Sequence, residues 1–309
     1  MMLIPAALLS AAACVQERAA AFEIADAIEE RYVIENVATR SAEIIRRDIA
    51  AGALDVNCGD GPEFAEHLTR YLRDITGDKH FFVDFPSGND DGDDWIEEWR
   101  KGAAANAYGI ARVERMSGNI GYLALSSFYE YEPAKEALKG AFTLLSTSDA
   151  MILDLRDNGG GSPETAWPIE WTFRDAGAAI ARRIDCRVCE EQPLKEADFD
   201  WPRYGSEKPL VILINKRSFS AAEAVAYGLQ AEGRATVIGD GSGGGAHMVG
   251  EGVRVSGGWV VGIPEARPLN SMSQSNWEGG GIVPDIAVPS EDALSEALEF
   301  LTNKAPNMR

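Results

Sequence analysis

A serine at the predicted start of a helix is the first feature that could carry out chemistry. Leu210–Ile214 is entirely apolar and predicts a buried strand, and a helix is predicted from Ser220 onward. A hydroxyl at such a junction faces the positive end of the helix, and the backbone N–H of Ala221 points to the same place, so a developing anion would be stabilised there. Ser220 and Glu223 also fit an ordinary capping box, S-x-x-E. The motif therefore predicts either a nucleophile or a helix cap.

A glycine-rich turn follows a second predicted strand, Ala150–Leu155. Asn158 is followed there by Gly159, Gly160 and Gly161. Glycines allow close approach of the backbone and present N–H donors, which an oxyanion hole requires. The Gly-Lys-Ser/Thr of a phosphate loop does not occur at this turn. The alternative is an ordinary tight turn between a strand and a helix.

A nucleophilic serine needs a base, and the sequence contains few. The histidines are His67, His80 and His247, and the only lysine after Ser220 is Lys304. A Ser–Lys dyad with its lysine downstream is therefore nearly excluded. His67 lies in a predicted helix and is interpreted as a surface or packing residue. His80 follows a glycine–aspartate turn and leads into a predicted strand, where it can be held rigidly.

His247 is the weaker candidate for the base. It follows a glycine-rich run whose freedom would have to be frozen at every turnover, at an entropic cost. The sequence therefore favours a substrate-contacting or loop-anchoring role for His247 and predicts His80 as the base.

The elements that must position these residues fall into a helical part and an α/β part. Apolar residues recur at helical spacing from about residue 20 to 74, and a turn then leads into a short strand that ends near residue 85. Later strands alternate with helices, which implies a sheet with helices on its faces. The predicted domains are a signal or lipoprotein signal segment (1–19), a small helical bundle (20–85), a linker or exposed loop (86–117) and the α/β core (118–305).

Four blocks of sequence resemble the tail-specific, or C-terminal processing, protease superfamily. The blocks are Leu153–Gly160, Ser218–Glu223, Val237–Asp240 and Gly281–Asp285, and the resemblance runs from about Ala20 to Pro289. The helical start that ends in His80 is similar to the branch that contains interphotoreceptor retinoid-binding protein and the tricorn protease core. The resemblance implies an α/β, ClpP/crotonase-like core with a mixed sheet, preceded by a small helical bundle. Only some forty residues separate His80 from Gly118, too few for the PDZ domain of many relatives.

The resemblance also implies roles for particular residues. Ser220 corresponds to the nucleophile, His80 to its base and Glu278 to the acid that stabilises the imidazolium. The oxyanion donors correspond to Gly159 or Gly160 and to Ala221. This chain departs from the family pattern in two places: Gly243–Gly245 stands where the Ser–Lys branch has its lysine, and Lys79 stands where the tricorn branch has a serine before the histidine. How Glu278 would reach and orient His80 is left open by the second departure.

These residues predict a serine peptidase that acts on a peptide or protein through an acyl-enzyme, without a metal or another cofactor. The alternative is a non-catalytic protein on the same fold that binds an apolar small molecule or a peptide. Acidic residues outnumber basic ones by 49 to 29, which gives a formal net charge of −20. Such a charge repels phosphate backbones, so we do not expect a nucleic-acid partner.

The N-terminal segment predicts export to the periplasm or the cell exterior. Met1–Ala13 contains no charged side chain, is too short to span a bilayer and suits the apolar region of a secretory signal. Small residues before Cys14 also resemble a lipoprotein cleavage site, at which a lipidated Cys14 would anchor the protein to a membrane. A helical N-terminus that packs on the body of the protein is the third possibility. In an exported protein, Cys186 and Cys189 could close a small disulfide and leave Cys58 unpaired.

Overall fold

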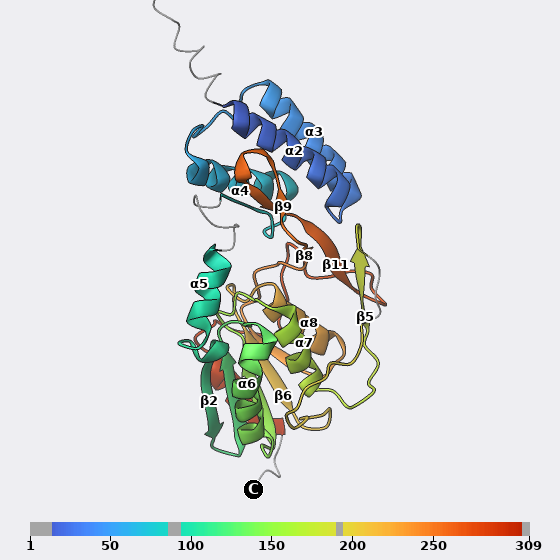
Figure 1. Ribbon diagram of the computed structural model, residues 1–309. Helices are drawn as coiled ribbons and strands as arrows, with labels where there is room; N and C mark the ends of the chain where they lie inside the picture. The colour runs from blue at the N-terminus through green and yellow to red at the C-terminus, as the bar shows by residue number, and fades with distance from the viewer. Residues whose placement is uncertain (1–13, 86–93, 190–193, 305–309) are drawn as a thin grey trace, which may run out of the picture. The chain divides into compact units, whose positions relative to one another are not determined.

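The computed structural model describes residues 14–85, 94–189 and 194–304 (Figure 1). The chain divides into two compact units, each built from several segments. The helical unit consists of Met1–Ile96, Ile184–Gln192 and His247–Pro268. The sheet unit consists of Glu97–Arg183, Pro193–Ala246 and Leu269–Arg309.

A six-stranded mixed sheet forms the centre of the sheet unit. Its strands lie in the order β12 (Ile286–Ala287), β7 (Thr236–Gly239), β6 (Leu210–Ile214), β4 (Ala150–Asp154), β3 (Ile120–Leu125) and β2 (Ile110–Met116). The first five strands are parallel to their neighbours, and β2 pairs with β3 in the antiparallel sense. The mixed α/β core predicted from the sequence is confirmed.

Helices cover both faces of this sheet. On one face α6 (Tyr131–Leu145), α7 (Pro163–Thr172) and α8 (Ala221–Ala231) form a core with alternate strand residues such as Leu153 and Ile212. On the other face α9 (Ala293–Lys304) packs against the residues between them, such as Ile152 and Val211. Strands that are buried on both faces read as continuous apolar runs, which explains why the sequence located β4 and β6 so directly.

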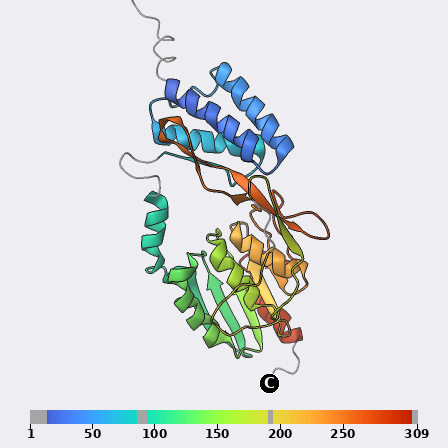
Figure 2. The ribbon, with the colours of Figure 1, turned by 45° about the vertical axis from the view of Figure 1, so that its right-hand side comes forward.

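The helical unit is built around α2 (Val15–Arg31), α3 (Glu35–Ala50) and α4 (Gly61–Thr76). A three-stranded antiparallel sheet, β1 (Phe82–Asp84), β10 (Val260–Gly262) and β9 (Val253–Arg254), packs its apolar side chains into the same core. Figures 1 and 2 both show this late segment, drawn in orange, beside the blue N-terminal helices. A third sheet has the order β5 (Arg182–Cys186), β11 (Pro264–Asn270) and β8 (Met248–Val249).

The expected domain boundaries need two corrections. The expected linker 86–117 contains helix α5 (Asp94–Ala103), the short helix η1 (Ala107–Gly109) and strand β2, while its residues 86–93 lie outside the described part of the chain. β2 lies at the edge of the sheet, and the charged residues Arg112, Glu114 and Arg115 interrupt its apolar pattern, which hid the strand. The expected core 118–305 is not one unit either, since 184–192 and 247–268 belong to the helical unit.

The signal segment expected at the N-terminus falls mostly on residues 1–13, which lie outside the described residues. Residues 15–19 belong to α2, which begins directly after Cys14. Cys14 is disulfide-bonded to Cys58, and Cys186 to Cys189. The expectation that Cys58 is unpaired is therefore wrong, and a sulfur bonded to Cys58 cannot also carry a lipid. Within the described ranges, no helix has the length and apolar character needed to cross a membrane.

We expect the Cys14–Cys58 disulfide to stabilise the helical unit. It joins residues 44 positions apart, and closing a loop of that length lowers the entropy of the unfolded chain, for a stabilisation of up to about 4 kcal/mol. Urea unfolding of the double variant Cys14→Ser/Cys58→Ser should show this loss. The matched control is Cys186→Ser/Cys189→Ser, whose cysteines are only 3 positions apart and should cost about 2 kcal/mol or less. Equal losses in the two variants would contradict the prediction.

Candidate active site

Ser220 occupies a strained position between a buried strand and a helix. Strand β6 ends at Ile214, a turn of six residues (215–220) follows, and α8 begins at Ala221. Ser220 has φ 54° and ψ −120°. A positive φ at a residue other than glycine costs about 1–3 kcal/mol and persists only where surrounding contacts enforce it. Such strain is frequent at active sites, so it favours the interpretation of Ser220 as a nucleophile.

Hydrogen bonds from the neighbouring strand end hold the serine turn in place. The Phe219 N–H donates to the Asn158 carbonyl at 2.9 Å. The Ser218 hydroxyl donates to the Leu155 carbonyl at 2.7 Å and accepts the Asn215 N–H at 2.9 Å. Ser218 is fully buried, so its hydroxyl is committed to the turn. These bonds supply the external support that the strained Ser220 backbone needs.

Gly160 brings the glycine-rich turn directly against Ser220. A Cβ added to Gly160 would lie 2.8 Å from the Ser220 Cβ and 3.0 Å from the Ala221 nitrogen, and Gly160 has φ +101°. A residue with a side chain therefore cannot occupy this position without displacing the serine turn. The Gly160 N–H donates to Asn158 Oδ1 at 2.8 Å, whereas Gly159 lies exposed beside it. Ala221 is the first residue of α8, and N–H groups in a first helical turn have no partner within the helix.

Glu223 is a buried carboxylate whose importance the sequence only hinted at. It is fully buried and accepts the Ser220 N–H at 2.9 Å, which is one half of the capping box expected from S-x-x-E. It also accepts the Ser242 hydroxyl at 2.5 Å and the N–H groups of Gly244 and Gly245 at 2.7 and 2.8 Å. One side chain thus connects the serine turn to the glycine-rich loop. Only the spacing to Ser220 could have drawn attention to it.

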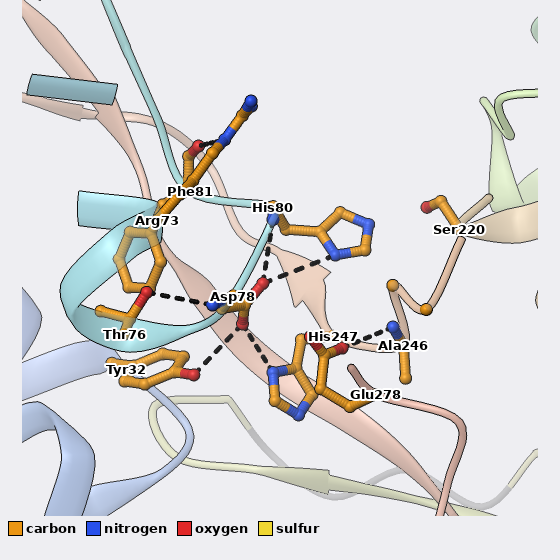
Figure 3. A network of polar contacts seen from close by, with 12 residues as sticks. Tyr32, Arg73, Thr76, Asp78, His80, Phe81, Ser220, Ala246, His247 and Glu278 are labelled. Carbon is orange, nitrogen blue, oxygen red and sulfur yellow. Dashed lines mark hydrogen bonds and ion pairs between the residues drawn. The ribbon is translucent and has the colours of Figure 1, made fainter. Parts of the chain in front are cut away.

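The glycine-rich loop is more firmly held than its composition suggested. Beyond the bonds to Glu223, the Ala246 N–H donates to Glu278 Oε2 at 2.6 Å, and the Trp277 indole donates to the Gly245 carbonyl at 2.9 Å (Figure 3 for Ala246 and Glu278). The expectation of a loop that must be frozen at every turnover is therefore wrong. The reason is that two carboxylates distant in sequence replace the side-chain packing that glycines lack.

His80 sits in a turn that several hydrogen bonds make rigid, as the sequence suggested. Helix α4 ends at the left-handed Gly77, φ 78°, and the Asp78 N–H donates to Thr76 Oγ1 at 3.1 Å. The His80 N–H donates to Asp78 Oδ1 at 2.9 Å, which forms an Asx turn. The Arg73 side chain donates to the Phe81 carbonyl at 2.8 Å, and β1 follows (Figure 3).

The Asp78 carboxylate lies between two histidines of the helical unit. Its Oδ2 is 2.6 Å from His247 Nδ1 and accepts the Tyr32 hydroxyl at 3.2 Å, and its Oδ1 is 3.7 Å from His80 Nδ1 (Figure 3). Burial acts to raise the pKa of Asp78, but hydrogen bonds from His247 and His80 outweigh it and hold the pKa well below its usual range. Asp78 is therefore ionised at neutral pH.

Sequence reasoning missed Asp78 and Tyr32. The one available signal was an aspartate two residues before His80, the spacing of an Asx turn. His247 is 5% exposed, and its bond to Asp78 favours the loop-anchoring alternative over substrate contact. His67 lies in α4, as predicted.

Cys14, Asp55 and Cys58 of the helical unit place possible metal-ligand atoms close together. Both of these sulfurs are in the disulfide, so neither is available as a thiolate ligand.

The predicted site residues are distributed over both units. Ser220 and Glu278, with the expected oxyanion donors Gly159, Gly160 and Ala221, belong to the sheet unit, which brings Gly160, Ser220 and Ala221 together. His80 and His247 belong to the helical unit, where Asp78 connects them. The expected nucleophile therefore belongs to the sheet unit and the expected base to the helical unit, each held by contacts within its own unit.

The mixed sheet carries the strained serine turn and the glycine-rich turn on one α/β core, and comparison with known proteins identifies the family of the chain. The sequence profile of peptidase family S41 matches residues 119–288, more than half of the chain. The chain belongs to peptidase family S41, which confirms the predicted superfamily of tail-specific proteases.

Two curated relatives illustrate the similarity. A carboxy-terminal-processing protease of Bartonella bacilliformis is 33% identical over 129 residues, which cover 40% of this chain and 29% of the relative. Carboxyl-terminal-processing peptidase 2, chloroplastic, of Arabidopsis thaliana is 31% identical over 128 residues, which cover 40% of this chain and 23% of the relative. The matched segment thus spans less than a third of either relative.

Two solved structures share the fold over almost the whole chain. A lipoprotein from Streptococcus agalactiae superposes with a TM-score of 0.64 at 15% identity and covers 98% of this chain and 99% of its own. A photosystem II D1 C-terminal processing protease gives a TM-score of 0.56 at 17% identity, with 94% and 97% covered. At these identities the likeness concerns the fold.

Gly160→Ala should disable the serine turn. The added methyl group would lie 2.8 Å from the Ser220 Cβ, and a displacement of about 1 Å at a reacting group can cost a hundredfold in rate. The rate of Ser220 labelling by a fluorophosphonate should fall about a hundredfold, and the melting temperature should also fall. Gly140→Ala in α6 is the control, because a Cβ there would meet nothing within 4 Å. If both variants are labelled at the wild-type rate, the close packing of Gly160 on Ser220 is not needed for the reactivity of Ser220.

Proposed function

We propose that this chain is a serine peptidase that cleaves peptide bonds through an acyl-enzyme on Ser220. The strained backbone of Ser220 at the start of α8 is the observation that carries the proposal, since natural proteins keep such strain mainly where function requires it. Membership of peptidase family S41 supports a peptide or protein as the substrate. The family resemblance of the Ser218–Glu223 block supports the same assignment.

In the proposed reaction, His80 removes the proton from the Ser220 hydroxyl while Oγ forms a bond to the scissile carbonyl carbon. The proton then passes from the imidazolium to the leaving amine as the C–N bond breaks. Water, deprotonated by the same histidine, hydrolyses the acyl-enzyme and regenerates the serine. The residues come from both units, with Ser220 from the sheet unit and His80 from the helical unit.

The oxyanion of the tetrahedral intermediate would be stabilised by backbone N–H groups. We assign Gly159 and Ala221 as these donors. The Gly160 N–H is less suited, because it already donates to Asn158 Oδ1. Gly160 contributes instead by its lack of a side chain, which lets the turn lie against Ser220. Glu278 is the acid that the family resemblance assigns to the imidazolium, and its Oε2 also accepts the Ala246 N–H.

Export to an oxidising compartment accompanies the proposed activity. Two disulfides among the described cysteines support it, because disulfides persist in secreted and periplasmic proteins and are rare in the cytosol. The apolar Met1–Ala13 segment supports it independently. The disulfide at Cys14 disfavours a lipid anchor at that residue, and it requires a secretory signal to be cleaved before Cys14 rather than after residue 19.

Fluorophosphonate labelling tests the nucleophile. A base-activated serine attacks the phosphorus atom readily, so the wild-type protein should be labelled on Ser220. Labelling should vanish in Ser220→Ala and persist in folded Ser218→Ala, whose hydroxyl is committed to Leu155 and Asn215. Intact-mass measurement counts the adducts. Unlabelled, folded wild-type protein would instead favour the alternative, a non-catalytic protein that binds a peptide or an apolar small molecule.

Peptide turnover by histidine variants tests the base. His80→Ala should lower kcat by several orders of magnitude, because nothing would then accept the serine proton. His67→Gln serves as the control, since His67 lies in α4 and is not assigned to the chemistry. The assay is hydrolysis of a quenched fluorescent peptide library. Equal activity of His80→Ala and wild type would refute His80 as the base and leave the Ser220 assignment to the labelling experiment.

A further inference from the structure

Three buried polar side chains of the helical unit have no role in the reaction as proposed, although they surround its base. Asp78, Tyr32 and His247 are 1%, 2% and 5% exposed. Polar groups are costly to bury unless they are hydrogen-bonded, and an ionised carboxylate is the most costly of them. A buried anion beside a histidine often determines the tautomer and the charge of the imidazole ring.

The two oxygens of Asp78 have separate partners. Oδ1 accepts the backbone N–H of His80 at 2.9 Å and lies 3.7 Å from Nδ1 of the same residue. Oδ2 contacts His247 Nδ1 at 2.6 Å and accepts the Tyr32 hydroxyl at 3.2 Å (Figure 3). The carboxylate cannot rotate without breaking at least one of these bonds. It is therefore a fixed negative charge on the Nδ1 side of His80.

A fixed anion in this position has a defined chemical effect. A histidine that accepts a proton at Nε2 must carry its hydrogen on Nδ1, and a carboxylate beside Nδ1 selects that tautomer and stabilises the imidazolium. The 3.7 Å separation between Asp78 Oδ1 and His80 Nδ1 is longer than a hydrogen bond. Contacts of this kind are often loose in an enzyme without substrate and shorten in the reacting complex.

We propose that Asp78 is a positioning residue for the His80 base, and that His247 and Tyr32 hold its carboxylate in place. The inference rests on the proposed function, because it requires His80 to act as the base. It adds to the family pattern an acid that precedes the histidine by two residues in the chain. It also answers how His80 is oriented when Lys79 stands in place of the serine of the tricorn-like branch.

The same geometry shows which ring nitrogen of His247 carries the hydrogen that is shared with Asp78. Because Asp78 is ionised, its Oδ2 can only accept, so the hydrogen between the two residues belongs to His247 Nδ1. His247 is thus a donor that fixes the shared carboxylate. Its ring also packs edge-on against Tyr32, with the ring centres 6.2 Å apart, so the two residues that hold Oδ2 support each other.

Asp78→Asn tests the proposal, with Asp84→Asn as the matched control. Asp84 is on the same segment, is partly exposed, and its carboxylate accepts the adjacent Phe85 N–H. Both variants remove one negative charge and keep the size of the side chain. We expect Asp78→Asn to lower kcat about a hundredfold or more at unchanged KM, because the imidazolium loses its anion. Asp84→Asn should retain wild-type kcat.

The pH dependence of kcat/KM separates a positioning role from a structural one. The titratable groups that contact Asp78 among the described residues of its unit are Tyr32, His80 and His247. A carboxylate beside an imidazole favours the charged form of the ring, and Asp78→Asn removes that negative charge. The acid limb of the Asp78→Asn profile should therefore move to lower pH. A fall in kcat with an unmoved acid limb would overturn the proposal, as would wild-type kcat in Asp78→Asn.

Tyr32→Phe keeps the inference testable if Asp78→Asn fails to fold. It removes one hydrogen bond to Oδ2 and leaves the ring that packs on Phe81 and His247. We expect kcat about two- to tenfold lower, with the acid limb moved in the same direction. Wild-type kinetics in Tyr32→Phe, with Asp78→Asn unfolded, would overturn the inference. Peptide hydrolysis that persists at the wild-type rate in Ser220→Ala is a separate result, because it would refute the proposed function itself.

Discussion

The parallel pairing of β4 with β6 is the constraint on which the candidate site depends. Asp154 lies opposite Leu213 in the ladder, so the two strands end at the same edge of the sheet. The chain leaves β4 through the glycine-rich turn and leaves β6 through the serine turn. Ligand sites in open α/β sheets form where the carboxyl ends of strands release their loops in this way. The contact between Gly160 and Ser220 is therefore a consequence of strand register, and the Asn158–Phe219 and Leu155–Ser218 hydrogen bonds reinforce it.

Buried carboxylates then fix the segments that the strands alone do not. Glu223 is fully buried and Asp78 almost so. An ionised carboxylate loses several kcal/mol of hydration on burial, which hydrogen-bond donors must replace. Glu223 obtains its donors from the serine turn and the glycine-rich loop. Asp78 obtains its donors from Tyr32, the residue directly after α2, from its own turn and from the residue after that loop. The need to satisfy each charge thus orders backbone that is rich in glycine and has little apolar packing of its own.

The sequence predicted those features that depend on local pattern. The strand Leu210–Ile214, the mixed α/β core and the serine and glycine turns all follow from apolar runs and turn residues along short stretches of chain. It failed where the determining contact is distant. The Asp78 carboxylate meets Tyr32 from 46 residues away and His247 from 169 residues away, and no periodicity records such a pairing. Helix α5 is a different case, because Trp95, Trp99 and Ala103 recur at helical spacing, and the acidic stretch before them led to the interpretation of the whole region as a linker.

The same distant contacts determine how far the helical unit can be regarded as an independent domain. Its core is filled in part by residues that come after the glycine-rich loop: Trp259 is 2% exposed and lies 5.5 Å from Phe64 between ring centres, and Val261 is fully buried in the same cluster. A fragment that ended near Phe85 would expose the apolar surfaces of α2 and α4 that these residues cover, and β1 would lose its partner β10. His247, the first residue of this late segment, is also the one that holds Asp78. The rigidity of the His80 turn therefore depends on a stretch of chain that the ribosome makes long after the helices, so the helical unit can be completed only once most of the sheet unit has been synthesised.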